Sequence, residues 1–251
     1  MTTAVATTSA PSPDRTERRR MDPMRKVALA GGIAYLVTFI ASIPQLALFA
    51  DIIDDPSGFI TGTGSNSAVL LGSWLEVITA FACVATAVAL YPATRIVSKT
   101  AAIGFVTSRV IEASMILVGV LSVLSVVSLK ADFAGATGAE AGTLQMIGES
   151  LMTVREWTFL IGPGTVVGIN ALFLGYVMYK GRLVPRAIPM LGLIGAPLIL
   201  TSATVTLFGG WSQVSTAGAL LVLPCALWEL SLGLYLTFKG FKTAPAPVAV
   251  S

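Results

Sequence analysis

Residues 101–129 read AAIGFVTSRVIEASMILVGVLSVLSVVSL, an apolar run that contains one arginine and one glutamate. A helix needs about 20 apolar residues to cross about 30 Å of hydrocarbon, so this run is long enough to span a membrane. Backbone amides in lipid must be satisfied within the segment, and the run is too long and too evenly apolar for a barrel strand. The stretch therefore predicts a transmembrane helix with charges inside it.

Five further stretches show the same pattern, at residues 27–50, 68–91, 151–179, 187–208 and 216–238. The composition agrees, because 55% of the 251 residues are hydrophobic and only 12% are charged. A soluble domain of this length would need far more charge to cover its surface. We therefore expect an all-α, polytopic membrane protein with six transmembrane helices in a compact bundle.

The basic residues predict the orientation of these spans. Thirteen of the 16 Lys and Arg fall in the tails and loops of one side: Arg15, Arg18, Arg19, Arg20, Arg25, Lys26, Arg95, Lys99, Lys180, Arg182, Arg186, Lys239 and Lys242. The loops of the other side carry Lys130 and six acidic residues. Cytoplasmic loops are enriched in Lys and Arg, so we expect a multi-pass cell-membrane protein with both termini in the cytoplasm. The net charge of +3 then requires no nucleic acid partner.

The two ends of the chain differ from its apolar centre. Residues 1–22 are rich in Thr, Ala, Ser and Pro and are expected to form a disordered basic tail, and residues 243–251 a second disordered tail. Residues 23–242 form the predicted transmembrane domain. A basic cluster beside the first span would orient it and contact anionic lipid head groups: Arg18, Arg19, Arg20, Arg25 and Lys26.

Several short stretches carry a family resemblance. They are VALAGGIAY at 27–35, ALY at 89–91, SRVIEA at 108–113, LGYVMYK at 174–180, LVPR at 183–186, and the pairs at 223–224, 229–230 and 239–240. In order and spacing they resemble the DUF4386 family, uncharacterised bacterial integral membrane proteins, over about residues 25–242. Members often carry a His near the start of the fourth span, whereas this chain has no His and reads Arg155-Glu156-Trp157 there. The resemblance implies a membrane architecture and no activity.

Ionisable residues within spans are costly and are candidates for function. Counting nine or ten residues inward from the lysine at the cytoplasmic end of four spans reaches polar side chains at one depth: Tyr35, Arg109, Asn170 and Glu229. At the helical rise this layer lies about 15 Å in. Glu112 follows Arg109 by one helical turn, on nearly the same face. We expect a buried polar cluster in which Arg109 pairs with Glu229, Glu112 or both.

Two carboxylates around one guanidinium would leave a surplus negative charge, which a proton or a cation would balance. Two other interpretations stay open: Arg109 extends towards the nearer membrane surface, or the pair only fixes helix register. Near the opposite surface, Glu76 and Arg155 lie at similar depth and form an outer candidate site. They would make an ion pair, or Glu76 would be an entrance group for a cation or an amine.

Several kinds of chemistry are absent from the sequence. Without His there is no Ser/His dyad, no His-based metal site and no membrane zinc protease. No Asp lies within a span, and Cys83 and Cys225 are in separate spans, so an aspartyl protease and a cysteine metal cluster are excluded. We expect no catalytic residues, no metal site and no cofactor. The sequence favours a non-enzymatic protein.

Three functions remain. The first is a small-molecule or ion binding or transport protein, which predicts a cavity open to one side at the depth of Arg109. Six spans are few for a carrier, so this function also predicts a homo-oligomer. The second is a structural or regulatory membrane subunit without a substrate, which predicts a tightly packed cluster and no cavity. The third is a membrane enzyme with a glutamate as acid or base, which predicts a pocket holding two carboxylates.

Overall fold

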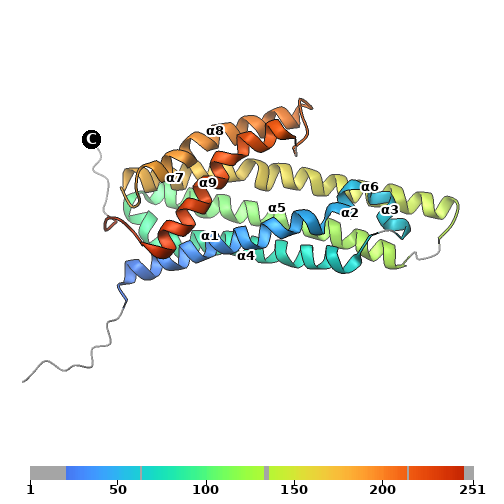
Figure 1. The fold of residues 1–251 in the computed structure, drawn as a ribbon, viewed down its shortest axis with the longest axis horizontal. Coiled ribbons are helices and arrows are strands. Elements are labelled where there is room, and N and C mark those ends of the chain that lie inside the picture. Colours follow the sequence, from blue (N-terminus) through green and yellow to red (C-terminus); the bar gives the residue numbers. More distant parts are fainter. Residues whose placement is uncertain (1–20, 63, 133–135, 214, 246–251) are drawn as a thin grey trace, which may run out of the picture.

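The structure is a computed structural model that describes residues 21–62, 64–132, 136–213 and 215–245 (Figure 1). These residues form helices joined by short connections, with no strand among them. The elements are α1 (Pro23–Leu48), α2 (Ala50–Asp54), α3 (Pro56–Thr61), α4 (Asn66–Val97), α5 (Lys99–Asp132), α6 (Ala139–Ile161), the π-helical turn η1 (Gly162–Val166), α7 (Val167–Lys180), α8 (Ala187–Leu207) and α9 (Thr216–Phe238).

Six helical segments are long and apolar enough to cross a membrane, which confirms the predicted number of spans. Five are single helices, and α6, η1 and α7 together form the fourth, a continuous run from Ala139 to Lys180. The chain is therefore a multi-pass membrane protein. The fourth span begins earlier than the predicted 151, because Glu140 and Glu149 end the apolar run without ending the helix.

The six spans pack in a ring in sequence order. Helix α1 packs on α4, α4 on α5, α5 on α6, η1 and α7, α7 on α8, and α8 on α9, which returns to α1. Neighbours in the sequence are thus neighbours in space, so short connections are sufficient. The fold places the start of α1 and the end of α9 at the same end of the ring (Figure 1). We call it the basic end, after the cations there: Arg25, Lys26, Arg95, Lys99, Lys180, Arg182, Arg186, Lys239 and Lys242.

The basic end is densely packed. A Cβ on Gly32 of α1 would lie 2.6 Å from the Thr237 backbone nitrogen, so only glycine allows α1 and α9 to approach this closely. The Arg25 guanidinium donates hydrogen bonds to the carbonyls of Leu236 at 2.9 Å and Thr237 at 2.6 Å. The two backbones and this double hydrogen bond together close the ring at its basic end.

The opposite end, which we call the far end, holds elements that the sequence did not predict. Asp55 caps α3 by accepting from the Gly58 amide at 2.8 Å, and Pro56 occupies the first turn. Helix α3 packs on α5 and α6 beyond the ends of α8 and α9 (Figure 1). A separate apolar core forms there: Phe49, Ile52, Phe59, Ile60, Val69, Val123, Val126, Val127, Leu144 and Met152.

The predicted tails fall mostly outside the described residues, which exclude 1–20 and 246–251. Where the structure begins, Asp22 caps α1 by accepting from the Arg25 amide at 3.0 Å. At the other end, the Thr243 hydroxyl donates to the Arg182 carbonyl at 2.9 Å, and the Lys242 amide donates to the Leu183 carbonyl at 2.6 Å. The chain after α9 is thus attached to the connection between α7 and α8.

Candidate functional site

Arg109 lies at the centre of the ring and contacts two carboxylates. Its Nη1 donates to Glu112 Oε2 at 3.0 Å, and its Nη2 donates to Glu229 Oε1. The Arg109 side chain is 2% exposed and that of Glu112 5%, whereas that of Glu229 is 15% exposed. Arg109 therefore pairs with both glutamates, one on its own helix and one on α9.

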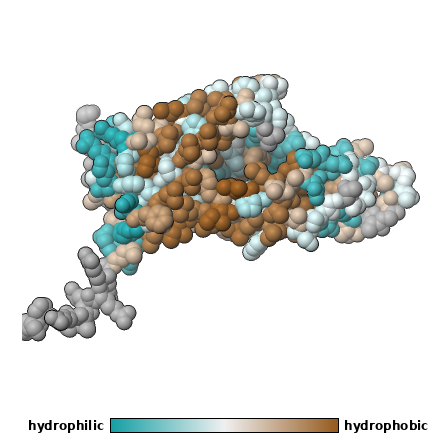
Figure 2. All heavy atoms as spheres, viewed as in Figure 1, coloured by the Kyte–Doolittle hydropathy of each residue, from teal (hydrophilic) through white to brown (hydrophobic). Residues whose placement is uncertain are grey.

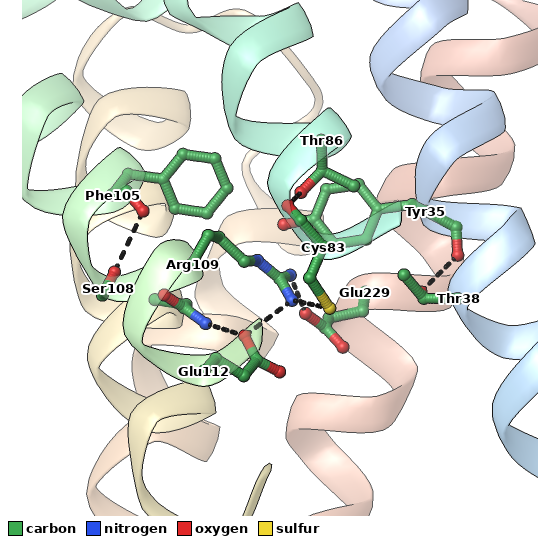
Figure 3. Close-up of polar contacts among 10 residues, drawn as sticks. Tyr35, Thr38, Cys83, Thr86, Phe105, Ser108, Arg109, Glu112 and Glu229 are labelled. Atoms are coloured by element: carbon green, nitrogen blue, oxygen red, sulfur yellow. Dashed lines mark hydrogen bonds and ion pairs between the residues drawn. The ribbon is translucent and has the colours of Figure 1, made fainter. Parts of the chain in front are cut away.

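Three more side chains contact the guanidinium or the Glu112 carboxylate beside it. The Tyr35 ring of α1 lies 5.0 Å from Arg109 Cζ, within the range of a cation–π contact. Arg109 Nη1 also lies 3.5 Å from the Cys83 sulfur of α4. Asn170 of α7 donates to Glu112 Oε2 at 2.6 Å. Figure 3 shows both carboxylates on one side of the guanidinium, away from the Tyr35 ring. Five helices thus contribute to one polar cluster.

The charges of the cluster do not cancel. One guanidinium faces two carboxylates, so the cluster of Arg109, Glu112 and Glu229 carries one surplus negative charge when all three are ionised. No described side chain donates to Glu112 Oε1 or Glu229 Oε2. A charged oxygen that receives no hydrogen bond from the protein leaves room for a proton, water or a cation beside it.

These carboxylates face a cavity of about 360 Å³. Side chains from α1, α4, α5, α6, η1, α7, α8 and α9 line it, including Arg109, Glu112 and Glu229 at one end and Glu76 at the other. We call it the central cavity. Its size falls in the range of about 300–1,000 Å³ that is typical of small-molecule sites. Most of its wall is apolar, with the charged groups confined to a few positions.

The outer candidates form a second buried ion pair. Arg155 Nη2 of α6 donates to Glu76 Oε1 of α4, and both side chains are nearly inaccessible. Phe49 and Phe159 lie 5.5 and 5.3 Å from Arg155 Cζ. Glu76 Oε2 is buried without a partner among the described residues. Here one cation meets one carboxylate, so this pair is neutral.

A second cavity of about 440 Å³ lies on the far side of this pair and is lined by Arg155, Trp157, Trp211 and Gln213. We call it the outer cavity. Gln45, Leu46 and Phe159 line both cavities, so the two cavities adjoin at these three side chains. Gln45 Oε1 is also buried with no hydrogen-bond partner in the part of the chain that the structure describes. The polar groups thus follow one path from the far end to Arg109.

The fourth span changes its helical geometry beside the central cavity. At η1 the Thr165 hydroxyl donates to the Leu160 carbonyl at 2.8 Å, five residues back. Pro163 has no amide hydrogen to donate, so the ordinary helical ladder is interrupted there. Single π-helical turns occur often at functional sites. Pro163 and the following Val167 both line the central cavity.

The chemistry of the site matches no familiar metal or cofactor centre. Among the residues that the structure describes, no group of three or more His, Cys, Asp or Glu could hold a metal ion. Arg109 within the cluster would also repel a bound metal. The arrangement can hold a positively charged group between Glu112 Oε1 and Glu229 Oε2.

The structure brings together all five residues of the predicted layer: Tyr35, Arg109, Glu112, Asn170 and Glu229. Their role as a binding site stays a prediction. The sequence analysis missed Cys83 and Gln45. Cys83 lies twelve residues inward from Arg95, deeper than the nine or ten residues of the depth count, so that count passed over it. Gln45 was visible only as a polar residue near the end of an apolar run.

Comparison with known proteins gives one match. The family described as "Domain of unknown function (DUF4386)" matches residues 30–240, which is most of the chain. No curated protein and no solved structure matches the chain. The function must therefore be argued from the site itself.

Proposed function

The chain belongs to the DUF4386 family, and we propose that it binds and transports a small organic cation at the cluster of Arg109, Glu112 and Glu229. The observation that carries this proposal is the surplus carboxylate charge, because it faces a cavity of about 360 Å³. A structural subunit would favour a neutral, tightly filled cluster. A cavity open at the depth of Arg109 is what a binding protein requires.

The shape of the cluster favours an ammonium group over a metal ion. A metal cation prefers several oxygen ligands in regular geometry, and here the guanidinium occupies the space between the carboxylates. A protonated amine can donate to Glu112 Oε1 and Glu229 Oε2 from the cavity side, and a quaternary ammonium group, which has no N–H, can lie beside them by charge attraction. Phe39 and Phe159 also line the cavity, and aromatic rings attract cations.

Orientation gives the direction of access. The positive-inside rule places the basic end in the cytoplasm, and so both termini. The chain would then be a cell-membrane protein whose cavities open away from the cytoplasm. Anionic lipid head groups would contact the basic end. A homo-oligomer would give a carrier of only six spans a larger body that stays fixed in the membrane.

Binding in lipid nanodiscs tests the proposal. We expect tetramethylammonium or methylammonium to bind saturably to the wild type, measured by calorimetry. Glu229→Gln should weaken this binding at least about tenfold, because it removes the surplus charge. Glu140→Gln is the matched control, since Glu140 is exposed in the first turn of α6.

Two results would contradict the proposal. One is the absence of saturable binding for every organic cation that is tried. The other is binding that Glu229→Gln and Glu140→Gln leave equally strong, since the cation would then lie elsewhere. If binding is found, uptake into proteoliposomes distinguishes a carrier from a protein that only binds.

A further inference from the structure

Helices α1 and α9 touch at the basic end and separate towards the far end. Their closest contacts are at Gly32 and Gly233, where a Cβ on Gly233 would lie 3.0 Å from Tyr35 Cβ. From this crossing α9 runs away from α1 and along α8 (Figure 1). The ring is therefore closed between α1 and α9 at one end only.

The central cavity extends into this separation. Its wall includes Phe39, Ser42, Ile43 and Leu46 from α1, and Val222, Ala226 and Glu229 from α9. Ile43 is 62% exposed and Leu46 64% exposed, although both line the cavity. Side chains that line a cavity and also face the outside mark its opening. Figure 2 shows a hollow there, bordered by apolar residues.

This opening, which we call the α1–α9 portal, lies at a depth where the surroundings are hydrocarbon. Ala226 and Val222 lie about 5 and 11 Å from Glu229 along α9, at 1.5 Å per residue. From Val222 back to its first residue, Thr216, α9 has nearly two more turns of mostly apolar residues. A ligand that passes between α1 and α9 would therefore come from the acyl chains of the adjacent leaflet.

The portal and the cluster differ in character, and together they define a type of ligand. The portal is apolar, whereas the carboxylate oxygens of Glu112 and Glu229 face the cavity behind it. A bare ammonium ion does not collect in hydrocarbon, but a cation with an apolar chain partitions into a bilayer. Such a molecule could place its charge at Glu229 while its chain extends past Ile43 and Val222.

We propose that the ligand is an amphiphilic cation which reaches the cluster laterally from the membrane through the α1–α9 portal. This inference rests on the proposed binding of an organic cation and adds its route and its apolar part. The competing route runs from water through the outer cavity, which shares Gln45, Leu46 and Phe159 with the central one.

Two probes with one head group test whether the chain of the bound ligand lies in the α1–α9 portal, as the lateral route requires. Tetramethylammonium and hexyltrimethylammonium differ only in that a hexyl chain replaces a methyl group. For wild type in nanodiscs we expect hexyltrimethylammonium to bind at least about tenfold more tightly, because its chain lies against apolar wall. Empty nanodiscs and Glu229→Gln correct for partitioning into the lipid.

A substitution in the portal completes the design. Ala226→Phe fills the opening on α9, and Ala219→Phe is its matched control, because Ala219 is exposed on the same helix and lines neither cavity. We expect Ala226→Phe to weaken hexyltrimethylammonium binding at least about tenfold, and Ala219→Phe to leave it unchanged. Thermal unfolding of each variant shows whether the bundle is intact.

The outcomes separate the two proposals. Equal affinity for the two probes, with no effect of Ala226→Phe, overturns the lateral route but leaves cation binding in place. Weaker binding of hexyltrimethylammonium than of tetramethylammonium overturns it as well. If neither probe shows binding that depends on Glu229, both the portal and the proposed function are wrong.

Discussion

Two buried arginines, Arg109 and Arg155, have different surroundings. Arg109 pairs with Glu112 and Glu229, whereas Arg155 pairs with Glu76 alone. The Arg155 pair joins two helices and is electrically balanced. The Arg109 cluster draws on five helices and keeps a surplus carboxylate beside a cavity. A structural ion pair needs only balance, so the surplus is the feature that distinguishes a candidate site from a helix contact.

The largest expected effect follows from removing Arg109. Arg109→Gln leaves two carboxylates buried without a cation, and breaking a buried pair typically costs about 3–5 kcal/mol. For a chain of this size that corresponds to a loss of about 10 °C in apparent Tm in detergent. The double variant Arg109→Gln with Glu229→Gln should recover part of the loss, since it leaves a single carboxylate.

Arg155→Gln is the matched comparison for this first prediction. It leaves only Glu76, so we expect a smaller fall in Tm than for Arg109→Gln. A fall as large as that of Arg109→Gln would show that the second carboxylate of the cluster adds no repulsion, and the contrast between the two sites would disappear.

The second prediction removes the carboxylate of a buried ion pair and leaves its arginine. Glu76→Gln leaves Arg155 buried beside Phe49 and Phe159 without a counter-charge. We expect a loss of about 3 kcal/mol, the lower part of the range for a broken buried pair. Thermal unfolding in detergent measures it, with Glu140→Gln on the exposed start of α6 as the control. An unchanged Tm for Glu76→Gln would mean that water reaching the pair already compensates Arg155.

Part of this arrangement could be predicted from the sequence, because hydrophobic thickness limits where charges can lie. Because a helix rises by a fixed distance per residue, the position of a residue along a span gives its depth in the membrane. Arg109, Asn170 and Glu229 were assigned to one layer in this way. Depth says nothing about position around the ring or about helix tilt. The separation of α1 from α9, and hence the cavity, depends on Gly32 and Gly233 meeting at one end.

The short helices α2 and α3 were missed for a different physical reason. They lie between two spans in a segment with Asp51, Asp54, Asp55 and Pro56, which is typical of a polar connection. Their helical form depends on burying Ile52 and Phe59 in the apolar core of the far end, to which α5 and α6 also contribute and which exists only in the folded chain. Local pattern alone could not reveal it.

The third prediction concerns the closed end of the bundle that supports Tyr35 and Arg109. Gly32→Ala would place a Cβ 2.6 Å from the Thr237 nitrogen, so α1 and α9 must move apart. Overpacking of this kind costs about 1–3 kcal/mol. Gly142→Ala on α6 is the control, because no atom lies within 4 Å of its added Cβ and it reports only the gain in helix propensity. A Tm for Gly32→Ala equal to that of the control would show that the two helices are not held together there.

The smallest loss of stability is expected for Glu229→Gln, and this variant gives the sharpest comparison between the Arg109 cluster and the Arg155 pair. This substitution leaves Arg109 matched one to one with Glu112, and the glutamine oxygen can still accept from Arg109 Nη2. Its new amide group replaces Oε2, the atom on the cavity side, so no buried charge is left unpaired. The free energy of unfolding should therefore change by less than about 1 kcal/mol, compared with about 3 kcal/mol for Glu76→Gln. Both substitutions replace a glutamate beside a buried arginine, so a difference in Tm between them reports the surplus charge together with the greater exposure of Glu229, 15% against 3% for Glu76. If both variants lost the same stability, Glu229 would be as necessary for folding as Glu76, and the charge attributed to ligand binding would be structural.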